Sequence, residues 1–371
     1  MPLFLFSFAF MRSLLFCLLC LSLQAAGQAE NWYKMLAGTI GNYPVVMHLH
    51  KAGHTYNGYY YYQSTQQPLP IMGEDTSVAG TVTLMVTSGG AKEGEFFQFT
   101  LIGGAAKGNW QLDDHQKTLP FIAKEQVSQT AFQYLNHKAA QPLKASMPNS
   151  PRVSYDAAIV WPTGGNGVGT AIRKRLVQFV GSGNQGGEAA ALMQQAQSNL
   201  FAAYRKEFGQ TKEEELKEMP AAFTNDQSQR ALVAYSGKAF LSLSLFTYAY
   251  TGGAHGNYGT QFQSFNLASG KALQVKDVLN PAGIKALSKL LAAAFREREG
   301  LSAATPLTEG GLFENKLKTT DNFFVTGKGL GFNYQPYEIG PYAMGEIILY
   351  LPYARIRNYL QPGFANALKK N

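Results

Sequence analysis

The sequence predicts an α+β protein built from two parts. The first is a small antiparallel β meander or barrel, and the second is a mixed α+β domain with an antiparallel sheet and packed helices. A length of 371 residues favours two domains, and the 24 Phe and 20 Tyr favour strands. Short segments of alternating polarity, separated by Gly, Pro and Asp, fill the first third of the chain, as in small all-β domains.

Residues 1–29 have the pattern of a signal peptide. They contain no acidic residue and a single basic residue, Arg12, and the apolar run 13–23 precedes a stretch of small residues. The run is shorter than the roughly 20 apolar residues that span a bilayer, so export with cleavage is favoured over a membrane anchor. We therefore expect a periplasmic or secreted protein with no stable transmembrane segment after cleavage, whose start is either Met1 or Met11.

Cysteine use and charge exclude several classes of function. Both cysteines, Cys17 and Cys20, lie in the expected signal peptide, so neither disulfides nor thiol chemistry are expected afterwards. The formal net charge of +8 is not concentrated in any basic run, which gives no support to nucleic-acid binding. The sequence contains neither a Gly-x-Ser-x-Gly elbow nor a phosphate-binding loop, and we expect no cofactor.

Residues 30–124 are expected to form the all-β domain. Its most unusual segment holds four consecutive tyrosines, Tyr59 to Tyr62. On a strand, Tyr59 and Tyr61 share one face and Tyr60 and Tyr62 the other. We expect one pair in the core and the other exposed or half-exposed, where it stabilises the sheet as an aromatic ladder or stacks on sugar rings.

Residues 125–150, which contain two prolines, are expected to be a linker, and 151–371 the α+β domain. Apolar residues at helical spacing predict helices over 188–218 and 281–298, with Pro281 suited to a first turn. A short terminal helix is expected from Tyr353. Alternation and turn residues predict strands over the remaining segments: 231–235, 239–250, a continuation near Tyr258, 322–325, 330–334 and 346–351.

Two histidines are the weak candidates for a metal site. His48 and His50 lie two residues apart on an expected strand, so that their imidazoles share one face. Such a pair can chelate zinc, but nothing nearby supplies a third ligand. We therefore predict no metal site, and expect these histidines on the solvent side near a turn.

Carboxylates offer a route to catalysis on glycans. Glu338 lies among aromatic residues and prolines, and a second acid could come from Glu314, Asp321 or Glu346. Two such groups at a suitable separation act as acid and base or nucleophile in glycoside hydrolysis. The alternative, which we favour, is that Glu338 accepts hydrogen bonds from backbone amides in a rigid loop.

The segment 250–258 places His255 among glycines in the connection between two expected strands. Glycine permits backbone angles closed to other residues and allows close approach of the main chain. As a catalytic base, His255 would need a partner, and Thr251 is a poor one. The remaining possibilities are an imidazole held by the loop and a direct contact to a ligand.

Two motifs in this half of the chain resemble a known family. The first comprises 250–257 (YTGGAHGN) and 265–273 (FNLASGKAL), and the second 322–325 (NFFV) and 336–345 (PYEIGPYAMG). Together they resemble the RsiV-like extracytoplasmic domain, long classed as a domain of unknown function, over roughly 150–360. The resemblance implies an α+β module outside the cytoplasmic membrane. In one relative this module belongs to an anti-sigma factor and binds lysozyme, and in others it accompanies a peptidoglycan deacetylase domain.

The sequence therefore favours an exported cell-envelope binding protein without catalysis, whose ligand is an envelope protein such as a lysozyme-like protein, or a glycan such as peptidoglycan. The alternatives are a glycan hydrolase that uses Glu338 and a purely structural envelope protein. We expect the loops 251–258 and 335–342 to meet at one end of the sheet. The binding candidates that they carry are Thr251, His255, Asn257, Tyr258, Tyr337, Glu338 and Tyr342.

Overall fold

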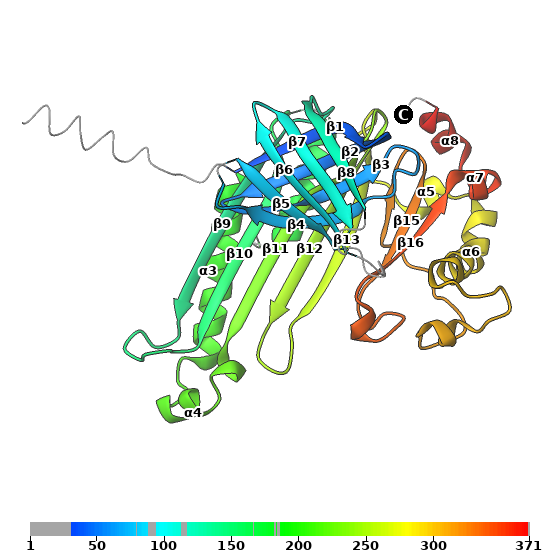
Figure 1. The fold of residues 1–371 in the computed structure, drawn as a ribbon. Helices are drawn as coiled ribbons and strands as arrows, with labels where there is room; N and C mark the ends of the chain where they lie inside the picture. The colour runs from blue at the N-terminus through cyan, green and yellow to red at the C-terminus, as the bar shows by residue number, and fades with distance from the viewer. Residues whose placement is uncertain are drawn as a thin grey trace, which may run out of the picture.

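The computed structural model describes residues 31–78, 80–87, 94–112, 117–165, 167–181, 183 and 186–369. Within these ranges the protein has the predicted α+β class, with a closed barrel, a five-stranded sheet and a three-stranded sheet accompanied by helices (Figure 1). The expected signal peptide and both cysteines lie outside the described residues. No helix in these ranges combines the length and the apolar character needed to cross a bilayer.

The N-terminal part is a closed barrel in which every neighbouring pair of strands is antiparallel, β1 and β8 included. Buried aliphatic and aromatic side chains fill its interior. Gly38 lets β1 lie close to β8, because a Cβ there would stand 1.9 Å from the carbonyl oxygen of Ile122. The strands are β1 Trp32–Ile40, β2 Tyr43–Ala52, β3 Thr55–Tyr62, β4 Leu69–Asp75, β5 Thr81–Val86, β6 Glu95–Ile102, β7 Ala105–Leu112 and β8 Thr118–Gln126.

The second part contains a five-stranded sheet in the order β13-β12-β11-β10-β9. Its strands are β9 Phe132–Pro142, β10 Arg152–Pro162, β11 Asn225–Ser236, β12 Phe240–Tyr250 and β13 Asn257–Asn266. The segment 125–150, expected as a linker, contains β9, which pairs with β10 along its whole length. The pair β10–β11 is parallel and departs from the antiparallel sheet that the sequence predicts.

A helical connection explains the parallel pair, because parallel neighbours need a long crossover. Between β10 and β11 the chain forms α2 Gly167–Val180, α3 Ala189–Phe208, α4 Glu213–Glu218 and the short turn η1 Pro220–Phe223. Helices α2 and α3 bury their apolar residues in the same core as the sheet. The helix expected over 188–218 is thus two helices, α3 and α4.

The C-terminal segment packs around a second core, formed by α6 and one face of the three-stranded sheet. Helix α6 begins where predicted, with Pro281 in its first turn and the side chain of Asn280 accepting a hydrogen bond from the Gly283 N–H. It ends at Gly300, whose φ is +68°. The elements are α5 Val275–Val278, α6 Pro281–Glu299, η2 Leu307–Gly310, β14 Phe323–Val325, β15 Gly329–Tyr334, η3 Tyr342–Met344, β16 Ile347–Pro352, α7 Tyr353–Ile356, η4 Arg357–Tyr359 and α8 Pro362–Leu368.

The tyrosine run in β3 joins the barrel to the five-stranded sheet. Tyr60 faces the barrel interior, whereas Tyr59 is buried in the core of the sheet. The rings of Tyr61 and Tyr235 on β11 lie 5.4 Å apart. The expectation of an exposed tyrosine pair is therefore wrong for Tyr59 and Tyr61, because the five-stranded sheet covers the outer face of β3.

His48 and His50 lie in the same contact, fully buried, so their expected place on the solvent side is wrong. The Nδ1–H of His50 donates to the carbonyl oxygen of Asn57 at 3.3 Å, and its Nε2 accepts from the N–H of Val233 on β11 at 3.1 Å. His48 Nδ1 lies 2.8 Å from the hydroxyl of Tyr33. Burial lowers the pKa of both imidazoles to about 3.

His50 has a structural role in this contact. The described part of the chain contains no group of three His, Cys, Asp or Glu residues that could hold a metal ion. His50 satisfies a backbone N–H of the sheet that would otherwise be buried without a partner. We therefore assign His50 to the joining of barrel and sheet.

Candidate functional site

Two loops distant in sequence come together beside β13. The loop between β12 and β13 carries His255, and the loop between β15 and β16 carries Tyr337 and Tyr342. The ring of Tyr342 stacks on His255 at 4.3 Å and lies 5.5 Å from the ring of Tyr337. Tyr258, on β13, meets Tyr342 edge to face at 5.6 Å. We call His255, Tyr258, Tyr337 and Tyr342 the aromatic cluster.

Hydrogen bonds fix the geometry of the aromatic cluster. The carbonyl oxygen of Gly256 accepts from His255 Nδ1–H at 3.0 Å and from the hydroxyl of Tyr342 at 2.9 Å. The hydroxyl of Tyr337 lies 3.4 Å from His255 Nε2. A Cβ at Gly256 would stand 2.5 Å from the ring of Tyr248, so a larger residue at this position would force that ring to shift. The two loops therefore hold each other in place.

Tyr337 is the most exposed tyrosine of the cluster, with 54% of its surface accessible. Its φ is +69°, in the left-handed region that a bulky side chain rarely adopts. The hydrogen bond from its N–H to the carbonyl oxygen of Gly340, 3.1 Å long, helps to keep the loop in this form. A strained, exposed aromatic residue is a candidate for function, because strain of this kind concentrates at ligand-binding sites.

The other predicted site residues lie at the border of the aromatic cluster. Thr251 and Asn257 are exposed at the two ends of their loop, and neither side chain has a hydrogen-bond partner among the described residues. Glu338 is also exposed, and its Oε2 accepts the N–H of Gln335 at 2.9 Å. This is the backbone-accepting role favoured for Glu338 from the sequence.

Glu346 has a different environment from Glu338. Its Oε1 accepts from the N–H of Thr260 at 2.6 Å and from the side-chain amide of Asn333 at 2.9 Å, and its Oε2 accepts from the hydroxyl of Thr260 at 2.8 Å. Asn322 accepts the N–H of Phe262 at 2.8 Å and donates to the carbonyl oxygen of Thr260 at 2.7 Å. We call Glu346, Asn333 and Asn322 the edge cap, because they bond the outer backbone groups of β13.

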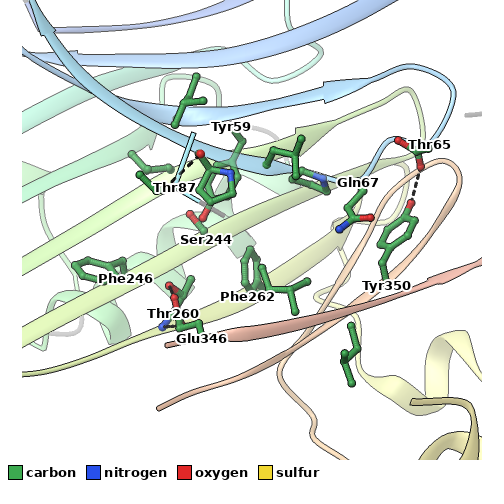
Figure 2. Close-up of a pocket in the computed structure, with 18 of the residues that line it drawn as sticks. Tyr59, Thr65, Gln67, Thr87, Ser244, Phe246, Thr260, Phe262, Glu346 and Tyr350 are labelled. Carbon is green, nitrogen blue, oxygen red and sulfur yellow. Dashed lines mark hydrogen bonds between the residues drawn. The ribbon is translucent and has the colours of Figure 1, made fainter. Parts of the chain in front are cut away.

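The aromatic cluster borders a cleft of about 1230 Å³ between three parts of the fold. Figure 2 shows residues that line this cleft. One wall comes from β3, β4 and the loop between them, a second from β11, β12 and β13, and a third from β16 and the helices that flank it. Tyr258 lines this cleft and also belongs to the aromatic cluster. The hydroxyl of Tyr350 on β16 donates to the carbonyl oxygen of Thr65 at 2.9 Å, which ties the third wall to the barrel.

The cleft and the edge cap are the features that the sequence did not reveal as a site. The cleft is lined by apolar side chains such as Phe246, Phe262 and Ile348, which come from the three strands β12, β13 and β16. Nothing in one alternating strand shows which other strand it will face. The acid Glu346 had been considered as a possible second carboxylate, but its bonds to β13 assign it to the edge cap.

Comparison with known proteins gives two family matches. Residues 276–354 match the model of a family described as a protein of unknown function (DUF3298), and residues 155–258 match a model described as deacetylase PdaC. No curated protein matches the sequence. The loop with His255 ends within the second matched segment, and the loop with Tyr337 lies within the first.

Two solved structures resemble the chain. A member of the DUF3298 family from Bacteroides fragilis is 20% identical, with a TM-score of 0.58, and the match covers 66% of this chain and 100% of that one. A DUF3298 family protein from Pseudomonas aeruginosa is 19% identical, with a TM-score of 0.43, over 63% of this chain and 96% of that one. The protein therefore contains segments that match the DUF3298 and PdaC models, and it shares the fold of the Bacteroides fragilis protein.

Proposed function

We propose that this protein is an exported, non-catalytic binding protein of the cell envelope that contacts its ligand through the aromatic cluster. The observation that supports this proposal is the convergence of two loops, 251–258 and 335–342, on one partly exposed group of stacked rings. Tyrosine and histidine rings held in place by neighbours lose little conformational freedom on binding. They also offer an apolar face beside polar atoms, which suits a protein surface or a sugar ring.

The RsiV-like resemblance extends this proposal to the kind of ligand. A relationship to the lysozyme-binding module favours a lysozyme-like protein, or the peptidoglycan on which such a protein acts. Each of the two matched segments contributes one of the two loops, which supports a binding site formed by both segments together. The signal-like pattern of residues 1–29 supports a periplasmic or secreted location, where both ligands occur.

Removal of the central rings is expected to weaken ligand capture. Tyr337→Ala and His255→Ala should each reduce binding about tenfold, the usual loss for a central contact residue of an interface. Binding is measured by sedimentation with purified peptidoglycan and by surface capture on immobilised lysozyme. Tyr43→Ala is the matched control, because Tyr43 is 57% exposed on the barrel, outside the aromatic cluster.

Each outcome of this experiment separates the proposal from its alternatives. A wild-type protein that captures neither probe, or variants that capture as well as the Tyr43→Ala control, would contradict the proposal. Soluble glycan fragments that disappear in Glu338→Gln would support a hydrolase instead. A lower melting temperature with unchanged capture would show that the aromatic cluster only maintains the fold.

A further inference from the structure

The strand β16 has an open edge along the cleft. The N–H of Asn333 donates to the carbonyl oxygen of Asn322, so the odd-numbered residues of β15 turn their backbone groups toward β14. The even-numbered residues of β15 therefore point their backbone N–H and C=O groups toward β16, where Phe332 pairs with Leu349. The backbone groups of Ile348 and Tyr350 must then point away from β15.

Among the residues that the structure describes, no partner satisfies these outward groups. Strand β16 pairs with β15 alone, and within the part of the chain that the structure describes the backbone N–H and C=O of Ile348 and Tyr350 make no hydrogen bond. Both residues line the cleft and are half-buried. The edge therefore presents two donors and two acceptors to a space that apolar side chains surround.

Strand β13 also has an edge in this cleft, but the outer backbone N–H groups of that edge are hydrogen-bonded. The outer N–H groups of Thr260 and Phe262 on β13 bond to Glu346 and Asn322 of the edge cap. Proteins commonly block sheet edges, because an open edge pairs readily with another chain. A fold that blocks β13 and leaves β16 open beside a cleft has a place for one added strand.

The surroundings of β16 indicate what kind of strand fits. On one side the cleft is lined by apolar residues, among them Phe262 and Met72, and on the other by Ala294 of α6. Of the cations that line the cleft, Arg230, Arg298 and Arg355 form ion pairs with Asp156, Glu299 and Glu297, and Lys328 has no ion pair among the described residues. An occupant with alternating apolar side chains and one acidic residue that pairs with Lys328 matches both features.

We propose that the cleft binds an extended segment of another protein, which adds as a fourth strand to β16. The segment presents apolar side chains at alternate positions, carries an acidic residue, and exchanges four main-chain hydrogen bonds with Ile348 and Tyr350. Main-chain bonds give this mode its affinity, and the pockets beside the strand give it specificity. The proposal does not depend on the aromatic cluster and would stand if that cluster had no ligand.

The test begins with a selection from random heptapeptides displayed on phage, against the complete protein. Selected peptides are synthesised, and their binding is measured by fluorescence anisotropy. Ile348→Pro removes one outward donor at an edge position that tolerates proline, and it should weaken binding about tenfold. Ile348→Val is the matched control, because it keeps the backbone donor and the apolar face, and its affinity should stay within about twofold of wild type.

A second readout distinguishes strand addition from simple filling of the cleft. Bound peptide should slow the hydrogen exchange of the Ile348 and Tyr350 amides, and N-methylation of alternate peptide amides should abolish binding. Selection of no peptide, or of peptides that leave both amides unprotected, would overturn the proposal. Displacement by dodecyl phosphate with no amide protection would identify the cleft as a site for an anionic amphiphile instead. The thermal stability of both variants is measured first. If Ile348→Pro is unstable, the amide protection of the wild-type protein and the binding of N-methylated peptides test the proposal.

Discussion

Lowering the pH from 7 to 5 is expected to remove about 4 kcal/mol from the free energy of unfolding, because two imidazoles must stay neutral in the folded protein. Burial lowers the pKa of His48 and His50 to about 3, from an ordinary value of 6.5. Between these two values the unfolded chain binds more protons than the folded one. Stability is therefore highest above pH about 6.5 and falls as the pH decreases toward 3.

Urea unfolding at a series of pH values measures this effect. The window from pH 7 to 5 lies above the ordinary pKa values of carboxyl groups, so the histidines dominate the slope. His54→Gln is the matched control, because 88% of the His54 side chain is exposed, and it should leave the slope unchanged. A wild-type protein whose stability does not change across this window would show that the two histidines are not buried together as described.

Replacing Glu346 by alanine is expected to destabilise the protein by about 3 kcal/mol. The change removes the carboxylate that accepts three hydrogen bonds and leaves the N–H of Thr260 without its partner at the edge of β13. Leaving a buried donor without its partner lowers the free energy of unfolding by more than the hydrogen bond alone contributes, because the donor stays desolvated. Chemical denaturation measures the loss, and faster hydrogen exchange of the Thr260 amide should accompany it.

Two further variants test this explanation of Glu346. Glu346→Gln keeps one acceptor oxygen and should lose about half as much stability as the alanine variant. Glu314→Ala removes an exposed carboxylate whose ion pair with Lys318 spans 3.4 Å at the surface, and it should be nearly neutral. If Glu346→Ala were as stable as Glu314→Ala, the edge cap would not contribute to the stability of the fold.

Local signals in the sequence predicted much of the architecture. Helix α6 was expected over 281–298 and is found at Pro281–Glu299, because its proline and its apolar stripe both act within one segment. The barrel strands were predicted from alternation and turn residues, which also act locally. The convergence of the loops with His255 and Tyr337 was expected from their rigid composition, and the structure places their rings together; their role in binding stays a prediction.

Features that depend on packing between distant segments were not predicted. Strand β10 contains the apolar run from Ala157 to Trp161, which does not alternate because helices cover one face of it and the barrel lies near the other. The burial of Tyr59 and of His48 depends on a sheet that begins about 70 residues later in the chain. The sequence of one strand does not indicate which surface will cover it, so the outward residues of the barrel strands were predicted to face solvent.

The shared contact between barrel and sheet also affects how the protein unfolds. Tyr61 rests on Tyr235, and His50 bonds to Val233, so separating the two parts would expose aromatic rings and a backbone amide to water. Neither part can then melt without disturbing the other. Heating should accordingly produce a single cooperative calorimetric peak. A fragment that contains only one of the two parts should be poorly folded and prone to aggregation.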